Sequence, residues 1–427
     1  MKRFFEIWRN LGPGLLYAGA AVGVSHLVQS TRAGADYGFY LMWILILANV
    51  IKYPFFEFAP RYVAATGQNL IQGYSLLGRK ALLLFVILQI STMFAIMAAV
   101  TMVTAGIISG ISGLSISPAL LSVVLLLILA VILLWGKYRT LDKMIRYIII
   151  LLSVSTILAL IYALGLPSTE GADFQKTFSW ANPIHLLFLI AFIGWMPSPI
   201  DVSVWHSVWS VEKRAQQGGK LSLKQALFDF RLGYIGTVFL AMCFLSLGAL
   251  VMYSSPEELS PNGAIFAVQF MGMYTLTIGP WAYWLIAVAA LTTMLSTTLT
   301  CMDAYPRVLS PATRMLCKGH YKLRFSESQL FLFWMLILLA GTIALLLFMP
   351  GTMRWMVDLA TTISFVTAPL LAILNYYTIT HRHVPEVFRP GLGLKIWAWT
   401  GILFLSLFSI IFIFWRFFPS FTTSLIP

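Results

Sequence analysis

Three side chains that can bind a metal ion lie in apolar stretches of this sequence. His26 is in the first long apolar run, and Met196 and Asp201 flank a Pro-Ser-Pro segment in a later run. Imidazole, thioether and carboxylate groups together suit Mn, Fe, Co or Zn better than Mg or Ca. His26, Met196 and Asp201 are therefore candidate metal ligands.

Each of these residues also has a structural interpretation. Asp201 would be stabilised by the helix dipole in the first turn of a helix, whether or not it binds a ligand. A lone histidine such as His26 can be a hydrogen-bonded packing residue, and its titration near neutral pH also suits a proton carrier. Met196 is one of 18 methionines, which often fill gaps in packing. Ionisable residues inside a membrane are costly, so each remains a functional hypothesis.

Further polar residues in apolar runs are candidates for a proton path or a gate. Lys52 and Glu57 lie five residues apart, so they do not share one helix face, although an ion pair remains open. Asp303 and Arg307 are one helical turn apart, which predicts an ion pair that acts as a gate or a structural tie. The complete set of these candidates is Lys52, Glu57, His206, Glu212, Asp303 and Arg307.

The elements that position these residues are membrane-spanning helices. The chain has 427 residues, of which 59% are hydrophobic and 10% charged, whereas soluble proteins carry about 25% charged residues. Apolar runs of about 18 residues or more indicate bilayer spans. We predict an all-α membrane protein with eleven transmembrane helices, at 11–33, 38–60, 81–108, 117–136, 144–166, 183–211, 229–253, 280–304, 328–349, 354–378 and 392–417.

The net charge of +13 is explained by membrane topology. With these spans, 23 of the 28 Lys and Arg residues fall in loops or at span ends on one side of the membrane, which is the positive-inside pattern. It predicts a cytoplasmic N-terminus, an external C-terminus and an odd number of spans. We expect a bacterial-type inner (plasma) membrane protein that contacts the lipid bilayer and does not bind nucleic acid.

Helix-breaking residues occur in corresponding spans of two halves of the chain. The first span contains several glycines around His26, and the sixth contains two prolines that flank a serine. Broken helices in matching positions mark the binding site of many transporters, because freed backbone groups must line a cavity or bury in protein. We predict one transmembrane domain over 1–427, with a first repeat at 11–166, an inverted second repeat at 183–378 and an extra helix at 392–417.

The sequence resembles the natural resistance-associated macrophage protein (Nramp) family of divalent-metal transporters, which have the LeuT-like fold. The motifs that carry the resemblance are Gly12-Pro13-Gly14, Gly34-Ala35, Gly38, Leu41-Met42-Trp43, Leu47-Ala48-Asn49, Ala65-Thr66-Gly67, Met196-Pro197, His206-Ser207, Ser296-Thr297-Thr298-Leu299-Thr300 and Pro369. The resemblance covers most of the chain. It implies broken helices 1 and 6 in a 5+5 inverted repeat and secondary transport by alternating access.

The departures from the family pattern fall on its metal site. The family's first-span Asp-Pro-Gly-Asn motif aligns with Gly23-Val24-Ser25-His26, so the metal-binding carboxylate is absent and His26 replaces the asparagine. Met196 matches the methionine ligand, and Asp201 is positioned to replace the carboxylate from the other broken helix. The family pattern and the departures from it together predict substrate contacts at Gly23, Ser25, His26, Met196, Ser198, Asp201 and Thr361. The family has a histidine at the position of Ser198 and a glutamine at the position of Thr361.

We weigh three functions. The first is import of a divalent transition metal, Mn- or Fe-like, with or without proton symport. The second is transport of a non-metal solute, an organic ion or inorganic anion, because half-helix N-termini near Gly23 and Pro199 would attract an anion. The third is a non-transporting sensor with the same fold. The sequence contains no nucleophile–base spacing, phosphate-binding loop or cofactor motif, so we expect neither an enzyme nor a cofactor.

Overall fold

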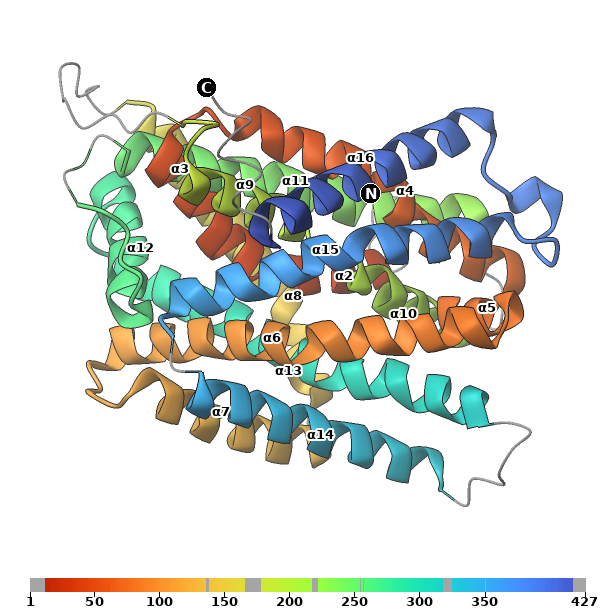
Figure 1. Ribbon diagram of the computed structural model, residues 1–427. Coiled ribbons are helices and arrows are strands. Elements are labelled where there is room, and N and C mark those ends of the chain that lie inside the picture. Colours follow the sequence, from red (N-terminus) through yellow and green to blue (C-terminus); the bar gives the residue numbers. More distant parts are fainter. Residues whose placement is uncertain are drawn as a thin grey trace, which may run out of the picture.

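The computed structural model is built from helices of very different lengths that run mostly side by side (Figure 1). It describes residues 12–135, 138–165, 178–216, 222–253, 255, 257–317, 325–349 and 351–417, and this part of the chain contains no β-strand. Seven of the described helices are long and apolar enough to span a membrane, and four more apolar helices have 10–17 residues. An all-α membrane architecture is therefore confirmed, whereas the count of eleven spans stays a prediction.

Every predicted span overlaps one helix, except the first and the sixth, which overlap several helical segments separated by a break. The elements are α2 (Pro13–Ala21), the π-helix η1 (Ser25–Ser30), α3 (Thr31–Tyr37), α4 (Met42–Thr66), α5 (Leu70–Leu77), α6 (Arg79–Ser112), α7 (Pro118–Leu134), α8 (Tyr138–Ala163), α9 (Pro183–Trp195), α10 (Asp201–Gln216), α11 (Leu223–Val251), α12 (Gly263–Ile278), α13 (Ala282–Cys317), α14 (Glu327–Phe348), α15 (Met353–Thr380), the 3₁₀ helix η2 (Glu386–Phe388) and α16 (Leu392–Phe417).

The predicted breaks in the first and sixth spans are confirmed. The first span consists of α2, η1 and α3, and regular helical geometry is lost at Val22, whose ψ is 86°. The sixth span consists of α9, which ends at Trp195, and α10, which begins at Asp201. Prolines 197 and 199 lie in the intervening segment, where each lacks a backbone donor and restricts the residue before it.

The Gly12-Pro13-Gly14 motif starts α2 and fixes it to α11. Pro13 occupies the first turn, where its missing N–H costs no helical hydrogen bond. The amide groups of Gly12 and Gly14 donate to the two carboxylate oxygens of Asp229, at 3.1 and 2.8 Å. A Cβ on Gly14 would overlap the Asp229 backbone, so this close approach requires glycine.

The long helix α6 lies in the middle of the bundle and packs against both α13 and α15. Helices α7 and α14 lie side by side on one outer surface, and α12 crosses one end of the bundle (Figure 1). The helices α5, α12 and η2 lie between the predicted spans and were not predicted. The broken helices α2–α3 and α9–α10 lie deeper, against α4, α11, α13 and α15.

We predict that the contact between α2 and α11 stabilises the whole fold. Asp229→Ala leaves the buried Gly14 N–H and the half-buried Gly12 N–H without an acceptor and should lower the free energy of unfolding by about 1–3 kcal/mol. Thermal unfolding in detergent micelles would measure the change. Glu386→Ala, at an exposed position, is the control and should stay within about 0.5 kcal/mol of the parent chain. Equal melting temperatures for Asp229→Ala and the parent chain would contradict the prediction.

Candidate functional site

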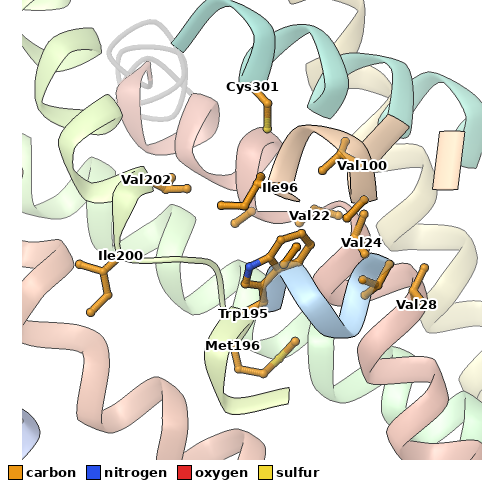
Figure 2. Close-up of a cluster of buried hydrophobic side chains, with 14 of the residues drawn as sticks. Val22, Val24, Val28, Ile96, Val100, Trp195, Met196, Ile200, Val202 and Cys301 are labelled. Atoms are coloured by element: carbon orange, nitrogen blue, oxygen red, sulfur yellow. The ribbon is translucent and has the colours of Figure 1, made fainter. Parts of the chain in front are cut away.

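The segments around the two helix breaks pack against each other through apolar side chains (Figure 2). The first broken helix contributes Val22, Val24 and Val28, and the second contributes Trp195 and Met196. All five are at most 3% exposed. Further apolar residues that Figure 2 labels in this cluster are Ile96, Val100, Ile200, Val202 and Cys301. The segments at the two breaks are therefore buried in this conformation, and part of their contact is apolar.

Gly23 shows why a carboxylate is missing from the first break. A Cβ on Gly23 would lie 2.9 Å from both Oγ1 and Cγ2 of Thr297, a residue of α13. That separation is shorter than ordinary van der Waals contact, so Thr297 occupies the space that a larger side chain at position 23 would need. An aspartate at this position would require the Thr297 side chain to shift.

His26 points from the first break toward α11. Its Nε2 lies 2.9 Å from the carbonyl oxygen of Thr237, so Nε2 carries a proton. Its Nδ1 lies 2.8 Å from the Ser25 hydroxyl, which also lies 2.7 Å from the Ala21 carbonyl oxygen. Both ring nitrogens are thus engaged, and a metal would have to displace Ser25 from Nδ1. If Nδ1 is protonated as well, every group in this chain of hydrogen bonds has a partner.

Met196 and Ser198 belong to the non-helical segment of the sixth span. The thioether sulfur of Met196 accepts a hydrogen bond from the Ser30 hydroxyl at 3.7 Å, and its side chain is completely buried. The hydroxyl of Ser198 is buried and has no hydrogen-bond partner among the described residues. Both residues therefore lie at a break, but neither contacts His26 through a hydrogen bond in the described chain.

Asp201 is the first residue of α10 and is 1% exposed. Its Oδ1 accepts a hydrogen bond of 2.5 Å from the Gln89 side-chain amide of α6. The side chains of Cys301 and Tyr305 on α13 are buried in the same part of the protein. The remaining oxygen of Gln89 and the Tyr305 hydroxyl lack hydrogen-bond partners in the described part of the chain. The buried surroundings of Asp201 thus include two oxygen atoms that have no hydrogen-bond partner among the described residues.

The structure does not bring the three predicted metal ligands together. His26 binds to α11, Met196 to Ser30 and Asp201 to α6. Within the described ranges, no group of three or more His, Cys, Asp or Glu side chains could hold a metal ion. Thr361, another predicted contact, donates its hydroxyl hydrogen within its own helix α15, where the Val357 carbonyl lies at 2.8 Å.

A second group of polar side chains lies between α2, α10 and α11. The Tyr17 hydroxyl is within reach of the Ser198 and Thr237 hydroxyls, but no hydrogen bond of good geometry satisfies it. The His206 ring lies 6.0 Å from the Tyr17 ring, and His206 Nδ1 also lacks a partner among the described residues. Buried polar atoms without partners are usually hydrated or take part in function. We call Tyr17, Ser198, His206 and Thr237 the Tyr17 cluster.

Lys52 and Glu57 do not form the ion pair that the sequence left open. Lys52 Nζ donates to the carbonyl oxygens of Ile193 and Gly194, at 2.6 and 2.7 Å. The Glu57 carboxylate pairs with Arg61 at 2.6 Å and with Arg231 at 3.2 Å. The five-residue spacing directs the two side chains to different faces of α4, so Lys52 contacts α9 and Glu57 contacts α11.

Arg307 pairs with Asp303 as the four-residue spacing predicts. Two hydrogen bonds of 2.8 Å join the guanidinium to the carboxylate, and Glu212 of α10 lies 3.5 Å away. These residues lie beside a cavity of about 460 Å³ that Glu212, Arg307, Asn69 and Gln72 help to line. The cavity is at the end of the bundle that contains α5.

The opposite end of the bundle is closed by a network that the sequence analysis missed. Arg32 of α3 forms a 2.7 Å ion pair with Asp358 of α15 and a 3.3 Å pair with Asp36. The Arg32 guanidinium also lies 4.4 Å from the ring centroid of Phe188 in α9. Gln29 donates to Asp358 at 3.4 Å. The only sequence signal was that Arg32 and Asp358 are charges inside or next to predicted spans.

Comparison with known proteins identifies the class. The family model described as natural resistance-associated macrophage protein-like matches residues 14–415. The uncharacterized protein PM0681 of Pasteurella multocida (strain Pm70) is 36% identical over 407 residues, which are 94% of this chain and 91% of that protein.

Solved transporter structures share the fold at low sequence identity. The Eremococcus coleocola manganese transporter, in complex with an aromatic bis-isothiourea substituted compound, has a TM-score of 0.66 and 16% identity, covering 96% of this chain and 87% of that one. MhsT in complex with L-phenylalanine has a TM-score of 0.62 and 14% identity, covering 93% and 97%. At these identities the likeness establishes the fold alone.

The fold and the family match define the protein as an integral membrane transporter with the LeuT-like architecture, and not an enzyme. The chain belongs to the Nramp family, as its sequence motifs indicated. Its first break differs from the family motif quoted above, because Gly23 stands at the aspartate position and lies against the Thr297 side chain.

We predict that Asp358 holds the end of the bundle near α3 closed. Asp358→Asn removes the charge that links α3 to α15 and should speed the reaction of a membrane-impermeant thiol reagent with Val28→Cys by about three- to tenfold. The rate would be followed in a chain that also carries Cys317→Ser. Asp36→Asn is the matched control, because Asp36 pairs with the same arginine within α3 and does not link two helices. Equal rates for Asp358→Asn and Asp36→Asn would contradict the prediction.

Proposed function

We propose that the protein is a secondary transporter that moves a divalent transition-metal ion, Mn- or Fe-like, by alternating access and together with protons. The observation that carries this proposal is the Asp201 carboxylate, which is 1% exposed and whose hydrogen-bond partner is the neutral amide of Gln89. None of the ion pairs among the described residues includes Asp201. A buried carboxylate without a cation is costly, so the site favours a cation.

The donor atoms around Asp201 support a borderline metal. The carboxylate, the free amide oxygen of Gln89, the Tyr305 hydroxyl and the Cys301 thiol combine hard oxygen with soft sulfur. Such a mixed set suits Mn, Fe, Co or Zn better than Mg or Ca. The manganese transporter with the same fold also supports this substrate class. Met196 adds a thioether at the same break, and we retain it as a ligand for conformations in which the break rearranges.

The hydrogen bonds of His26 suit a proton carrier better than a metal ligand. Both ring nitrogens face oxygen atoms, from Ser25 and Thr237, that can accept a hydrogen bond. The imidazolium form would therefore be fully hydrogen-bonded. Thr237 belongs to the Tyr17 cluster, which also contains His206 of α10. Glu212 lies further along α10 and lines the cavity. We propose that protons move along this series of side chains, separately from the cation at Asp201.

The two ends of the bundle support alternating access. Arg32, Asp358 and Phe188 close the end near α3, whereas the end near α5 has a cavity of about 460 Å³. We propose that the closed end faces outward and the cavity faces the cytoplasm, with a cytoplasmic N-terminus, an external C-terminus and a location in a bacterial-type inner membrane. We also propose eleven spans, arranged as repeats at 11–166 and 183–378 and an extra helix at 392–417.

One observation favours a non-metal solute as the second candidate. The centre between the breaks is lined by Val22, Val24 and Trp195 rather than by charged side chains. An organic ion with an apolar part would fit such a surface better than a hydrated metal. Binding of metals alone in a thermal-shift screen of metals, organic ions and inorganic anions would exclude this candidate.

We predict that Asp201 is required for metal uptake. Purified protein in liposomes should take up Mn²⁺, detected with an internal fluorescent indicator, and Asp201→Asn should lower the initial rate by at least about tenfold. The loss of a charged partner of a metal is expected to exceed the roughly 1.4 kcal/mol that corresponds to tenfold. Glu386→Gln, at an exposed carboxylate, should leave the rate unchanged. Undiminished uptake by Asp201→Asn would exclude the proposed metal site.

His26 should affect proton movement more than metal uptake. We predict that His26→Gln retains most Mn²⁺ uptake but loses the accompanying acidification, because glutamine can donate to Thr237 but cannot carry a second proton. A pH indicator inside the same liposomes would measure proton entry. Ser30→Ala, which alters the neighbouring contact to Met196, is the control for a general disturbance of the break. The assignment fails if metal and proton fluxes fall in equal proportion in His26→Gln.

A further inference from the structure

The side chain of Lys52 ends at the C-terminus of the half-helix α9. Its ammonium group donates hydrogen bonds of 2.6 Å to the Ile193 carbonyl and 2.7 Å to the Gly194 carbonyl. Both carbonyls belong to the last turn of α9, which ends at Trp195. Lys52 is completely buried. None of the ion pairs found among the described residues includes it.

This position has the properties of a cation site. The last carbonyls of a helix lack partners within the helix, and the helix dipole places about half a negative charge there. In transporters with broken helices, the carbonyl ends of half-helices bind the coupling cation. Here the cation is the ammonium group of Lys52, a residue of α4. Its distances to the two carbonyl oxygens are typical of strong charge-assisted hydrogen bonds.

The end of α9 is also fixed from the opposite side. A Cβ on Gly194 would overlap the backbone carbonyl of Thr361, so α9 and α15 are in close backbone contact at this point. The Trp195 indole donates to the Ser364 hydroxyl of α15 at 2.9 Å. The Lys52 ammonium therefore holds the break of the sixth span against α4 while these contacts hold it against α15.

We propose that the ammonium group of Lys52 occupies a monovalent-cation subsite at the carbonyl end of α9, so that the transporter closes its sixth-span break without binding Na⁺ or K⁺. The inference rests on the proposed transport function and deepens it, because it states that the transport cycle does not require Na⁺ or K⁺. Loss of the side chain would open a site for a small monovalent cation or a primary alkylammonium ion. The expected ligands of that opened site are Na⁺, K⁺ or n-propylammonium.

Thermal unfolding of the full chain in detergent tests this proposal without any transport assay. The melting temperature of the parent protein should be equal in chloride salts of Na⁺, K⁺ and N-methylglucamine at matched ionic strength. Lys52→Ala should melt at least about 2–4 °C lower. Added n-propylammonium or Na⁺ should restore most of this loss in a saturable manner, whereas tetramethylammonium, which cannot donate hydrogen bonds, should not.

Lys52→Met is the matched control, because it keeps most of the side-chain volume and removes the charge. It should melt below the parent protein and respond to none of the cations, since its side chain fills the subsite. Stabilisation of the parent protein by Na⁺ or K⁺ would overturn the proposal, as would a Lys52→Ala variant that no cation restores. If Lys52→Ala does not fold, Lys52→Met decides: a melting temperature equal to that of the parent overturns the proposal, and a lower one supports it.

These outcomes are separate from those of the transport function. A protein that moves no metal can still show the cation responses of Lys52→Ala, and a protein that moves Mn²⁺ can lack them. Uptake by the parent protein adds a second readout: replacement of Na⁺ by N-methylglucamine should leave its initial rate unchanged. A fall of more than about twofold would contradict the inference even if the proposed metal site were correct.

Discussion

The structure depends on satisfying the backbone groups that two interrupted helices expose inside a bilayer. Lipid provides no hydrogen bonds, so each freed group needs a partner from the protein. The carbonyls of Ile193 and Gly194 are bound by Lys52, and the Ala21 carbonyl lies 2.7 Å from the Ser25 hydroxyl. The start of α2 is bound by Asp229. These polar contacts allow non-helical segments to persist where the surrounding surface is apolar, and they fix the directions in which the site residues point.

Close backbone contacts then determine how much space the site has. Gly23 lies against Thr297, and Gly194 lies against the Thr361 backbone, so each broken helix touches an unbroken helix near its break. A side chain at position 23 would therefore have to displace that of Thr297. Asp201, at the start of α10, instead has a neighbour, Gln89, that can hydrogen-bond to it. The position of the buried negative charge therefore follows from packing as much as from the chemistry of a ligand.

The sequence allowed the broad architecture to be predicted, because hydropathy and helix-breaking residues act locally. The breaks of the first and sixth spans and the first-turn position of Asp201 follow from such local signals. The partners of the polar residues could not be predicted in this way. Lys52 binds backbone carbonyls, which have no sequence signature, and Arg32 and Asp358 are separated by 326 residues. The direction of His26 toward Thr237 likewise depends on the packing of α2 against α11.

The two charges at the sixth-span break complement the two half-helices in opposite senses. Lys52 places a positive charge at the carbonyl end of α9, and Asp201 places a negative charge at the amino end of α10. Each charge is favoured by the dipole of the half-helix that it contacts. With both present, the closed break has little net charge of its own, which suits a segment surrounded by apolar side chains. A divalent cation at Asp201 would leave an excess positive charge there, so the loaded state would favour any conformation that exposes the break to water.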